Sequence, residues 1–146
     1  MYYIENNDER IDVAEVEKDL NSFLSYLNET RDFSLSFISD DEIQSLNNEY
    51  RGIDSPTDIL TFAINDGEEF PSFEGEVEEL GDVFISIDSM ERNAKEFGVS
   101  PEEELKRLLL HGLLHLRGMD HKTNDFNTEP MLIEQERILK QIGILH

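Results

Sequence analysis

Apolar residues recur along the chain with two different periods, and these periods predict which segments are helices and which are strands. Between residues 12 and 28 they return every three or four positions, which predicts an amphipathic helix. Between residues 33 and 37 every second residue is apolar, as in a half-buried strand. Residues 59–64 and 83–87 are short apolar runs typical of buried strands, and residues 1–4 predict an edge strand.

Capping residues predict two short helices. Ser39 is followed three positions later by Glu42, a capping box that opens a helix. Asp88 and Glu91 have the same spacing before a helix that Gly98 ends. The inward face of the first helix is expected to contain Ile43, Leu46, Asn47 and Tyr50.

The most apolar helix is predicted to begin at Ser100 and to run to about Arg117. Ser100 is a good N-cap and Pro101 suits the first helical position. The segment is apolar on nearly all sides, which is typical of a buried central helix, and Gly118 is its expected end. A last helix is predicted from about residue 128 to 141. Residues 65–79, with six Glu and one Asp, predict a mobile, solvated loop.

The composition fits one folded domain over residues 1–146, because no repeat or linker divides the chain. The chain has no cysteine, which excludes disulfides and thiolate metal sites, so any metal must be held by His and carboxylate groups. The first residues lack the features of a signal peptide, and no stretch approaches the roughly 20 apolar residues of a membrane span. We therefore expect a cytoplasmic protein that does not contact membranes.

The charge balance is strongly acidic, with 34 acidic and 12 basic residues and a net charge of −22. Such a surface repels nucleic acids and anionic membranes. An RNA substrate would have to meet a local basic or metal-bearing cleft, or be presented by a partner.

Three of the four histidines lie close together in the sequence. His111 and His115 are four residues apart, so a helix projects both from one face, near enough to share a metal ion. Gly118 permits a sharp turn that brings His121 back as a third ligand. Three imidazoles leave the fourth position of a zinc ion open, as in catalytic sites. Without a metal, burying three histidines here would be unfavourable; His146 is simply explained as a solvated tail residue.

The spacing of these histidines is that of the metzincin peptidases, His-x3-His-x2-Gly-x2-His. Those enzymes have Glu directly after the first His, as the general base for the zinc-bound water. Gly112 stands at that position here. The ligand pattern is therefore present without the base that cleaves peptides.

Residues 111–121, HGLLHLRGMDH, closely resemble the signature of the YbeY family of bacterial endoribonucleases. Two more segments are similar to that family: Leu46-Asn47 with Tyr50-Arg51 followed by SPTDILTF at 55–62, and LGDVFIS at 80–86. Met119, Lys122 and Ala63 depart from the residues usual in the family, and none of the three is a ligand. The order of the motifs, the chain length and the closing helix also agree.

The resemblance implies an α+β fold: a single compact domain with a small mixed β-sheet of about four strands packed by about five helices. It implies one zinc ion, Zn²⁺, held by His111, His115 and His121 at the end of the buried central helix. The implied activity is single-strand-specific endoribonuclease cleavage in 16S rRNA 3′-end maturation and ribosome quality control. The implied partners are ribosomal RNA and the small subunit or ribosome-associated proteins.

The candidate catalytic residues are Arg51, by carry-over from the family, and the ligand His111. Zinc would activate a water molecule, and Arg51 would pair with the scissile phosphate. Asp120 either orients a ligand histidine or is an ordinary turn residue. Asp82, Asp58 and Thr61 either shape the cleft or are plain strand and loop residues. No general base is assigned.

Two other functions stay open at this point. One is a zinc hydrolase of another substrate, such as a metzincin-like peptidase with an unusual base. The other is a non-enzymatic ribosome-assembly factor in which zinc only stabilises the fold.

Overall fold

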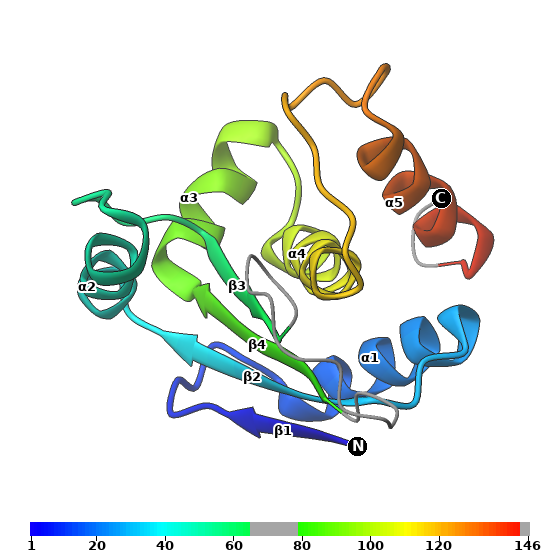
Figure 1. Cartoon of the computed structure of the whole chain (residues 1–146), viewed down its shortest axis with the longest axis horizontal. Helices are drawn as coiled ribbons and strands as arrows, with labels where there is room; N and C mark the ends of the chain where they lie inside the picture. Colours follow the sequence, from blue (N-terminus) through cyan, green and yellow to red (C-terminus); the bar gives the residue numbers. More distant parts are fainter. Residues whose placement is uncertain (65–78, 144–146) are drawn as a thin grey trace, which may run out of the picture.

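The computed structural model describes residues 1–64 and 79–143 and is drawn in Figure 1. Its elements, in chain order, are β1 (Tyr2–Glu5), α1 (Val13–Leu27), β2 (Asp32–Ile38), α2 (Asp40–Arg51), β3 (Ile59–Ala63), β4 (Glu79–Ser86), α3 (Ile87–Phe97), α4 (Pro101–Leu116) and α5 (Pro130–Gln141). Within these residues, no helix has the length and apolar run that crossing a membrane requires.

The four strands form one mixed sheet in the order β1-β2-β4-β3. Strands β1, β2 and β4 are parallel, and β3 pairs antiparallel with β4 at one edge. Gly81 in β4 has a φ of +138°, and a Cβ there would lie 2.0 Å from the Phe62 carbonyl oxygen, so glycine lets β3 approach this closely. The sheet and its helices confirm the predicted α+β fold.

Helix α4 is the centre of the molecule: it contacts α1, α3 and α5 as well as strands β3 and β4 (Figure 1). Its leucines fill the core, as the all-round apolar pattern predicted. Gly112 brings the helix close to the sheet, because a Cβ there would lie 3.1 Å from both Ile59 Cδ1 and Val83 Cγ1. This close packing sets how near the C-terminal turns of α4 lie to the sheet.

Two predictions of burial are wrong. The segment 59–64 was expected to be a buried strand, but β3 ends at Ala63 and only its Leu60 is buried. The reason is its place at the edge of the sheet, where it has a neighbouring strand on one side only. Tyr50 was expected on the inner face of α2, but it is 60% exposed, whereas Ile43 and Asn47 are buried.

Helix and strand starts also differ from the predictions. Helix α3 is capped by Ser86, whose hydroxyl accepts a hydrogen bond from the Ser89 N–H, and not by Asp88. The reason is that β4 runs directly into α3. Helix α5 begins at Pro130, two residues later than predicted. Strand β4 begins at Glu79, four residues earlier than predicted. The rest of the predicted loop, residues 65–78, and the predicted tail residue His146 lie outside the described residues.

Candidate metal centre and its cleft

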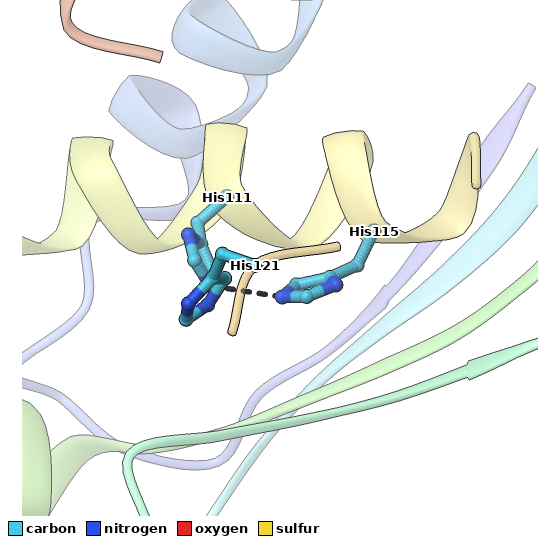
Figure 2. A group of neighbouring side chains, drawn as sticks. All are labelled: His111, His115 and His121. Carbon is cyan, nitrogen blue, oxygen red and sulfur yellow. Dashed lines mark hydrogen bonds between the residues drawn. The ribbon is translucent and has the colours of Figure 1, made fainter. Parts of the chain in front are cut away.

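Three imidazoles meet at the C-terminal end of α4. His111 and His115 project from successive turns of the helix, and the segment that follows it brings His121 beside them (Figure 2). One nitrogen from each ring lies within 4.8 Å of the others, and the Nε2 atoms of His111 and His115 are 3.0 Å apart. The bend occurs at Gly118, which has a φ of +99°, a conformation that glycine adopts without strain.

Hydrogen bonds from the outer ring nitrogens fix two of the imidazoles. His111 Nδ1 donates to the side-chain oxygen of Gln135 at 2.7 Å, and Gln135 is buried in α5. His121 Nδ1 donates to the carbonyl oxygen of Thr123 at 2.7 Å. These bonds place the proton on Nδ1 in both rings, which leaves Nε2 with a lone pair toward the cluster.

Helix α5 supports both of these hydrogen bonds. Gln135 comes from its second turn, and its amide nitrogen donates in turn to Glu136. Glu129, the residue that precedes the helix, accepts hydrogen bonds from the backbone N–H and the hydroxyl of Thr123. The closing helix therefore holds His111 directly and His121 through Thr123.

The electrostatics of the cluster favour a neutral His111 ring. Burial, together with the neighbouring His115, lowers the pKa of His111 to about 4. His111 is therefore uncharged at neutral pH. An uncharged imidazole is the form that binds a metal ion, so three ring nitrogens in this arrangement form a possible metal site.

Through His115 the cluster borders a cleft of about 560 Å³. The cleft is lined by Arg31, Arg51, Thr61, Ala63, His115, Leu116, Arg117, Gly118, Met119 and Asp120. Three of these ten residues are arginines and one is a carboxylate, although acidic residues outnumber basic ones almost threefold in the whole chain. The cleft is thus a local basic region in an acidic protein.

Arg51, the last residue of α2, lines this cleft and contacts the edge strand β3. Its Nη2 donates to the carbonyl oxygen of Thr61 at 2.8 Å, and its Cζ lies 5.2 Å from the centre of the Phe62 ring. Phe62 also stacks edge-to-face on Tyr50. The contacts of Arg51 with the Thr61 carbonyl and the Phe62 ring hold its guanidinium at the rim of the cleft, while its other N–H groups stay available to a ligand.

Comparisons with known proteins place the chain among characterised sequences. The sequence profile described as "Endoribonuclease YbeY" matches residues 2–143. The chain belongs to the YbeY endoribonuclease family. This confirms the predicted family and the predicted class of enzyme, a hydrolase.

Individual members of the family are similar over most of their length. The Endoribonuclease YbeY of Treponema denticola is 48% identical over 90% of this chain and 84% of its own. That of Halalkalibacterium halodurans is 44% identical over 79% and 74%. The solution structure of TM1509 from Thermotoga maritima superposes with a TM-score of 0.64 at 29% identity, covering 97% of this chain and 89% of that one.

The other residues singled out in the sequence lie in different surroundings. Thr61 and Asp120 line the cleft with Arg51 and His115. Asp120 Oδ1 accepts a hydrogen bond from the His121 backbone N–H at 2.8 Å and lies 4.0 Å from His115 Nδ1, too far for a hydrogen bond. The side chain of Asp120 is 86% exposed.

Two predicted residues lie away from the histidines. Asp82 accepts a hydrogen bond from Ser34 and alternates in β4 with Val83, which packs against α4, so Asp82 lies on the other face of the sheet. Asp58 precedes β3 and accepts a hydrogen bond from Asn93 of α3. Burial raises the pKa of Asp58. Neither residue lines the cleft.

The residues that support the site from a distance are not predicted by the sequence patterns. Gln135 and Thr123 hold ligand rings, and the buried carboxylate of Glu29 pairs with two of the cleft arginines, Arg31 and Arg117. Each of these contacts joins segments whose proximity depends on the tertiary fold or on an irregular turn. A buried Gln on the apolar face of a helix was the one available signal.

Proposed function

We propose that this YbeY family member is a zinc-dependent, single-strand-specific endoribonuclease that acts in 16S rRNA 3′-end maturation and ribosome quality control. The observation that carries the proposal is the cleft in which three arginines line the same wall as His115, one member of the three-histidine cluster. A metal site beside guanidinium groups suits a phosphodiester, because both kinds of group stabilise negative charge on phosphoryl oxygens.

The donor set fits zinc. Nitrogens bound to a tetrahedral zinc ion at about 2.0–2.1 Å lie roughly 3.3 Å from one another. The 3.0 Å between His111 and His115 and the 4.8 Å limit for the whole cluster bracket that spacing. When bound there, the ion would supply Lewis-acid activation of water and of a phosphoryl oxygen.

The chain's own residues would share the remaining work. His111 and His121 would hold the ion through Nε2, because Gln135 and Thr123 occupy their Nδ1 atoms. Arg51 binds a non-bridging oxygen of the scissile phosphate and offsets the charge that develops there. Its anchor on the Thr61 carbonyl reduces the side-chain motion that would be lost on binding.

The local charge answers the objection from the acidic surface. Arg31, Arg51 and Arg117 give the cleft the positive potential that an RNA strand needs, while the remaining surface repels it. Such a protein binds RNA only where a strand enters the cleft. This favours a single strand presented by a partner, and we propose the ribosomal small subunit or proteins bound to it, in the cytoplasm.

Packing at Gly112 disfavours the peptidase alternative. A metzincin places its general base at this position. A Cβ at Gly112 would lie 3.1 Å from the side chains of both Ile59 and Val83, so this direction is filled by the core and has no room for a carboxylate. An assembly factor with structural zinc is also disfavoured, because structural sites have four protein ligands and the residues that the structure describes bring three together.

The test is cleavage of a single-stranded RNA by the purified zinc-loaded protein, with the matching duplex alongside. We expect Arg51→Ala to lower kcat by about 10²-fold to 10³-fold, as loss of one charge-stabilising donor does. Arg137→Ala is the matched control, since Arg137 is an exposed arginine of α5 paired with Glu134. Equal cleavage by the Arg51 and Arg137 variants would remove Arg51 from the mechanism, and equal cleavage of the duplex would remove strand specificity.

A further inference from the structure

Two cleft arginines converge on one buried carboxylate. Arg31 precedes β2 and Arg117 follows α4, 86 positions later in the sequence. Glu29, just after α1, lies between them with only 5% of its side chain exposed. Its Oε1 accepts hydrogen bonds from Arg31 Nη2 at 2.7 Å and from Arg117 Nη1 at 2.6 Å.

The carboxylate is also fixed by the backbone. Glu29 Oε2 accepts hydrogen bonds from the N–H groups of Thr30 and Arg31 and from Arg31 Nε, each at 3.0 Å. The guanidinium of Arg31 beside it lowers the pKa of Glu29 to about 2. The carboxylate therefore stays ionised and holds both arginines in one place at any physiological pH.

The cluster retains positive charge and donors after these bonds are made. Two guanidiniums and one carboxylate sum to +1. Of the five N–H donors on each guanidinium, Arg31 uses two on Glu29 and Arg117 uses one. The side chains of Arg31 and Arg117 are 35% and 31% exposed, and both line the cleft that contains His115 and Arg51.

We propose that Arg31 and Arg117 form a binding subsite for the phosphodiester backbone of the RNA strand beside the scissile position, with Glu29 as a positioning residue. This proposal rests on the proposed function, since it names where the substrate strand continues beyond Arg51. A phosphate is the ligand that fits, because paired planar guanidiniums bind its oxygens through parallel N–H groups.

Glu29 would also prepare the two arginines for binding, which a simple surface ion pair does not do. Two guanidiniums held side by side repel each other, and the ionised Glu29 between them offsets that repulsion before RNA arrives. Because Glu29 orders both side chains in the free protein, less conformational entropy is lost when a phosphate binds.

The experiment measures binding of a fluorescently labelled single-stranded RNA to metal-free protein across a range of salt concentrations. Arg31→Gln and Arg117→Gln should each weaken binding by roughly 10-fold at low salt, as loss of a hydrogen bond to a charged group does. Each should also lower the slope of log affinity against log salt by about 0.7, the value for one phosphate contact of a single strand. Arg137→Gln removes one exposed, paired arginine elsewhere and should leave the slope unchanged.

A kinetic readout separates binding from structure. In the zinc-loaded protein, both variants should raise KM about 10-fold with little change in kcat, since the lost contact is made in substrate and transition state alike. Arg31→Lys and Arg117→Lys should recover the salt slope, because the charge is restored.

The outcomes overturn different statements. If wild-type protein cleaves RNA while both Gln variants keep the wild-type slope and KM, the subsite is wrong and the proposed function stands. If the folded wild-type protein shows no salt-dependent binding and no cleavage, both are wrong. Thermal unfolding of each variant checks that a lost signal is not lost folding.

Discussion

The two halves of helix α4 bury ionisable side chains against the same core, and this burial shifts their pKa values in opposite directions. In the N-terminal half, burial, together with the charge of nearby Asp58, raises the pKa of Glu104 to about 7. In the C-terminal half, burial lowers the pKa of His111 to about 4. Both shifts favour the neutral form.

The difference lies in what the neutral form can do. A neutral carboxyl group in the N-terminal half keeps the core free of charge and makes stability depend on pH. A neutral imidazole at the C-terminal half has a lone pair for a metal ion, and there the helix meets an arginine-lined cleft. Burial therefore makes stability depend on pH at the N-terminal half of α4, whereas at the C-terminal half it keeps His111 in the neutral form that can bind a metal ion.

The largest expected effect separates the two halves by activity. His115→Ala removes one ligand nitrogen and should lower single-strand RNA cleavage by at least about 10³-fold. Glu104→Gln, on the same helix and nearly the same in shape, should leave the rate unchanged. RNA cleavage measured on both variants with their zinc content tests this, and an active His115 variant would break the comparison.

The second effect concerns the junction between the halves, where Gly112 packs on Ile59 and Val83. Gly112→Glu would force a carboxylate into this contact and should lower the free energy of unfolding by about 3 kcal/mol, combining overpacking with charge burial. Gly112→Ala should cost less. Chemical denaturation measures both; a Glu variant as stable as wild type would mean that the position is open to the cleft.

The third effect weakens the support of one ligand without removing it. Gln135→Leu deletes the acceptor for His111 Nδ1 and should lower metal affinity by about 10-fold to 100-fold. Gln141→Leu is the matched control, since Gln141 is exposed on the same helix and bonds Tyr26 instead. Zinc titration against a competing chelator gives both affinities, and equal values would deny Gln135 its role.

The smallest effect is a pair of opposite pH dependences. Because the folded pKa of Glu104 is raised, the wild-type protein loses stability as pH rises from about 4.5 to about 7, and Glu104→Gln should gain relative stability over that window. The folded pKa of Glu29 is lowered to about 2, so its contribution is present above pH 4.5 and lost as pH falls toward 2.

Thermal unfolding of the two Gln variants against pH measures this pair. The melting temperature of Glu104→Gln should rise relative to that of wild type as pH increases above 4.5. The melting temperature of Glu29→Gln should be lower than that of wild type above pH 4.5 and should approach it as pH falls below 4.5. If the stability difference between variant and wild type changed with pH in the same direction for both variants, burial and ion pairing would not act on these two groups as described.

How much the sequence predicts depends on how local each interaction is. The histidine cluster is local: four-residue spacing on a helix, a glycine bend and a third His are all visible within eleven residues. The caps at Ser39 and Ser100 were predicted correctly for the same reason, because each bonds an N–H three residues away.

The errors and omissions arise from tertiary structure. Tyr50 has the spacing of an inner-face residue, but its ring meets only the edge of Phe62 in the edge strand among the aromatic contacts of the described residues, and it stays 60% exposed. The basic cleft draws Arg31, Arg51 and Arg117 from three distant segments, and the net charge of −22 pointed the opposite way. Gln135 supports His111 from 24 residues away, which no local pattern indicates.

The most direct test of the account is a zinc titration of metal-free protein in which RNA cleavage is measured at every step. We predict a rate that rises in proportion to added zinc, reaches its limit at one ion per chain, and stays at background throughout for His115→Ala. A rate that does not depend on zinc, or a His115 variant that follows the wild-type curve, would contradict the claim that these three histidines hold the catalytic metal.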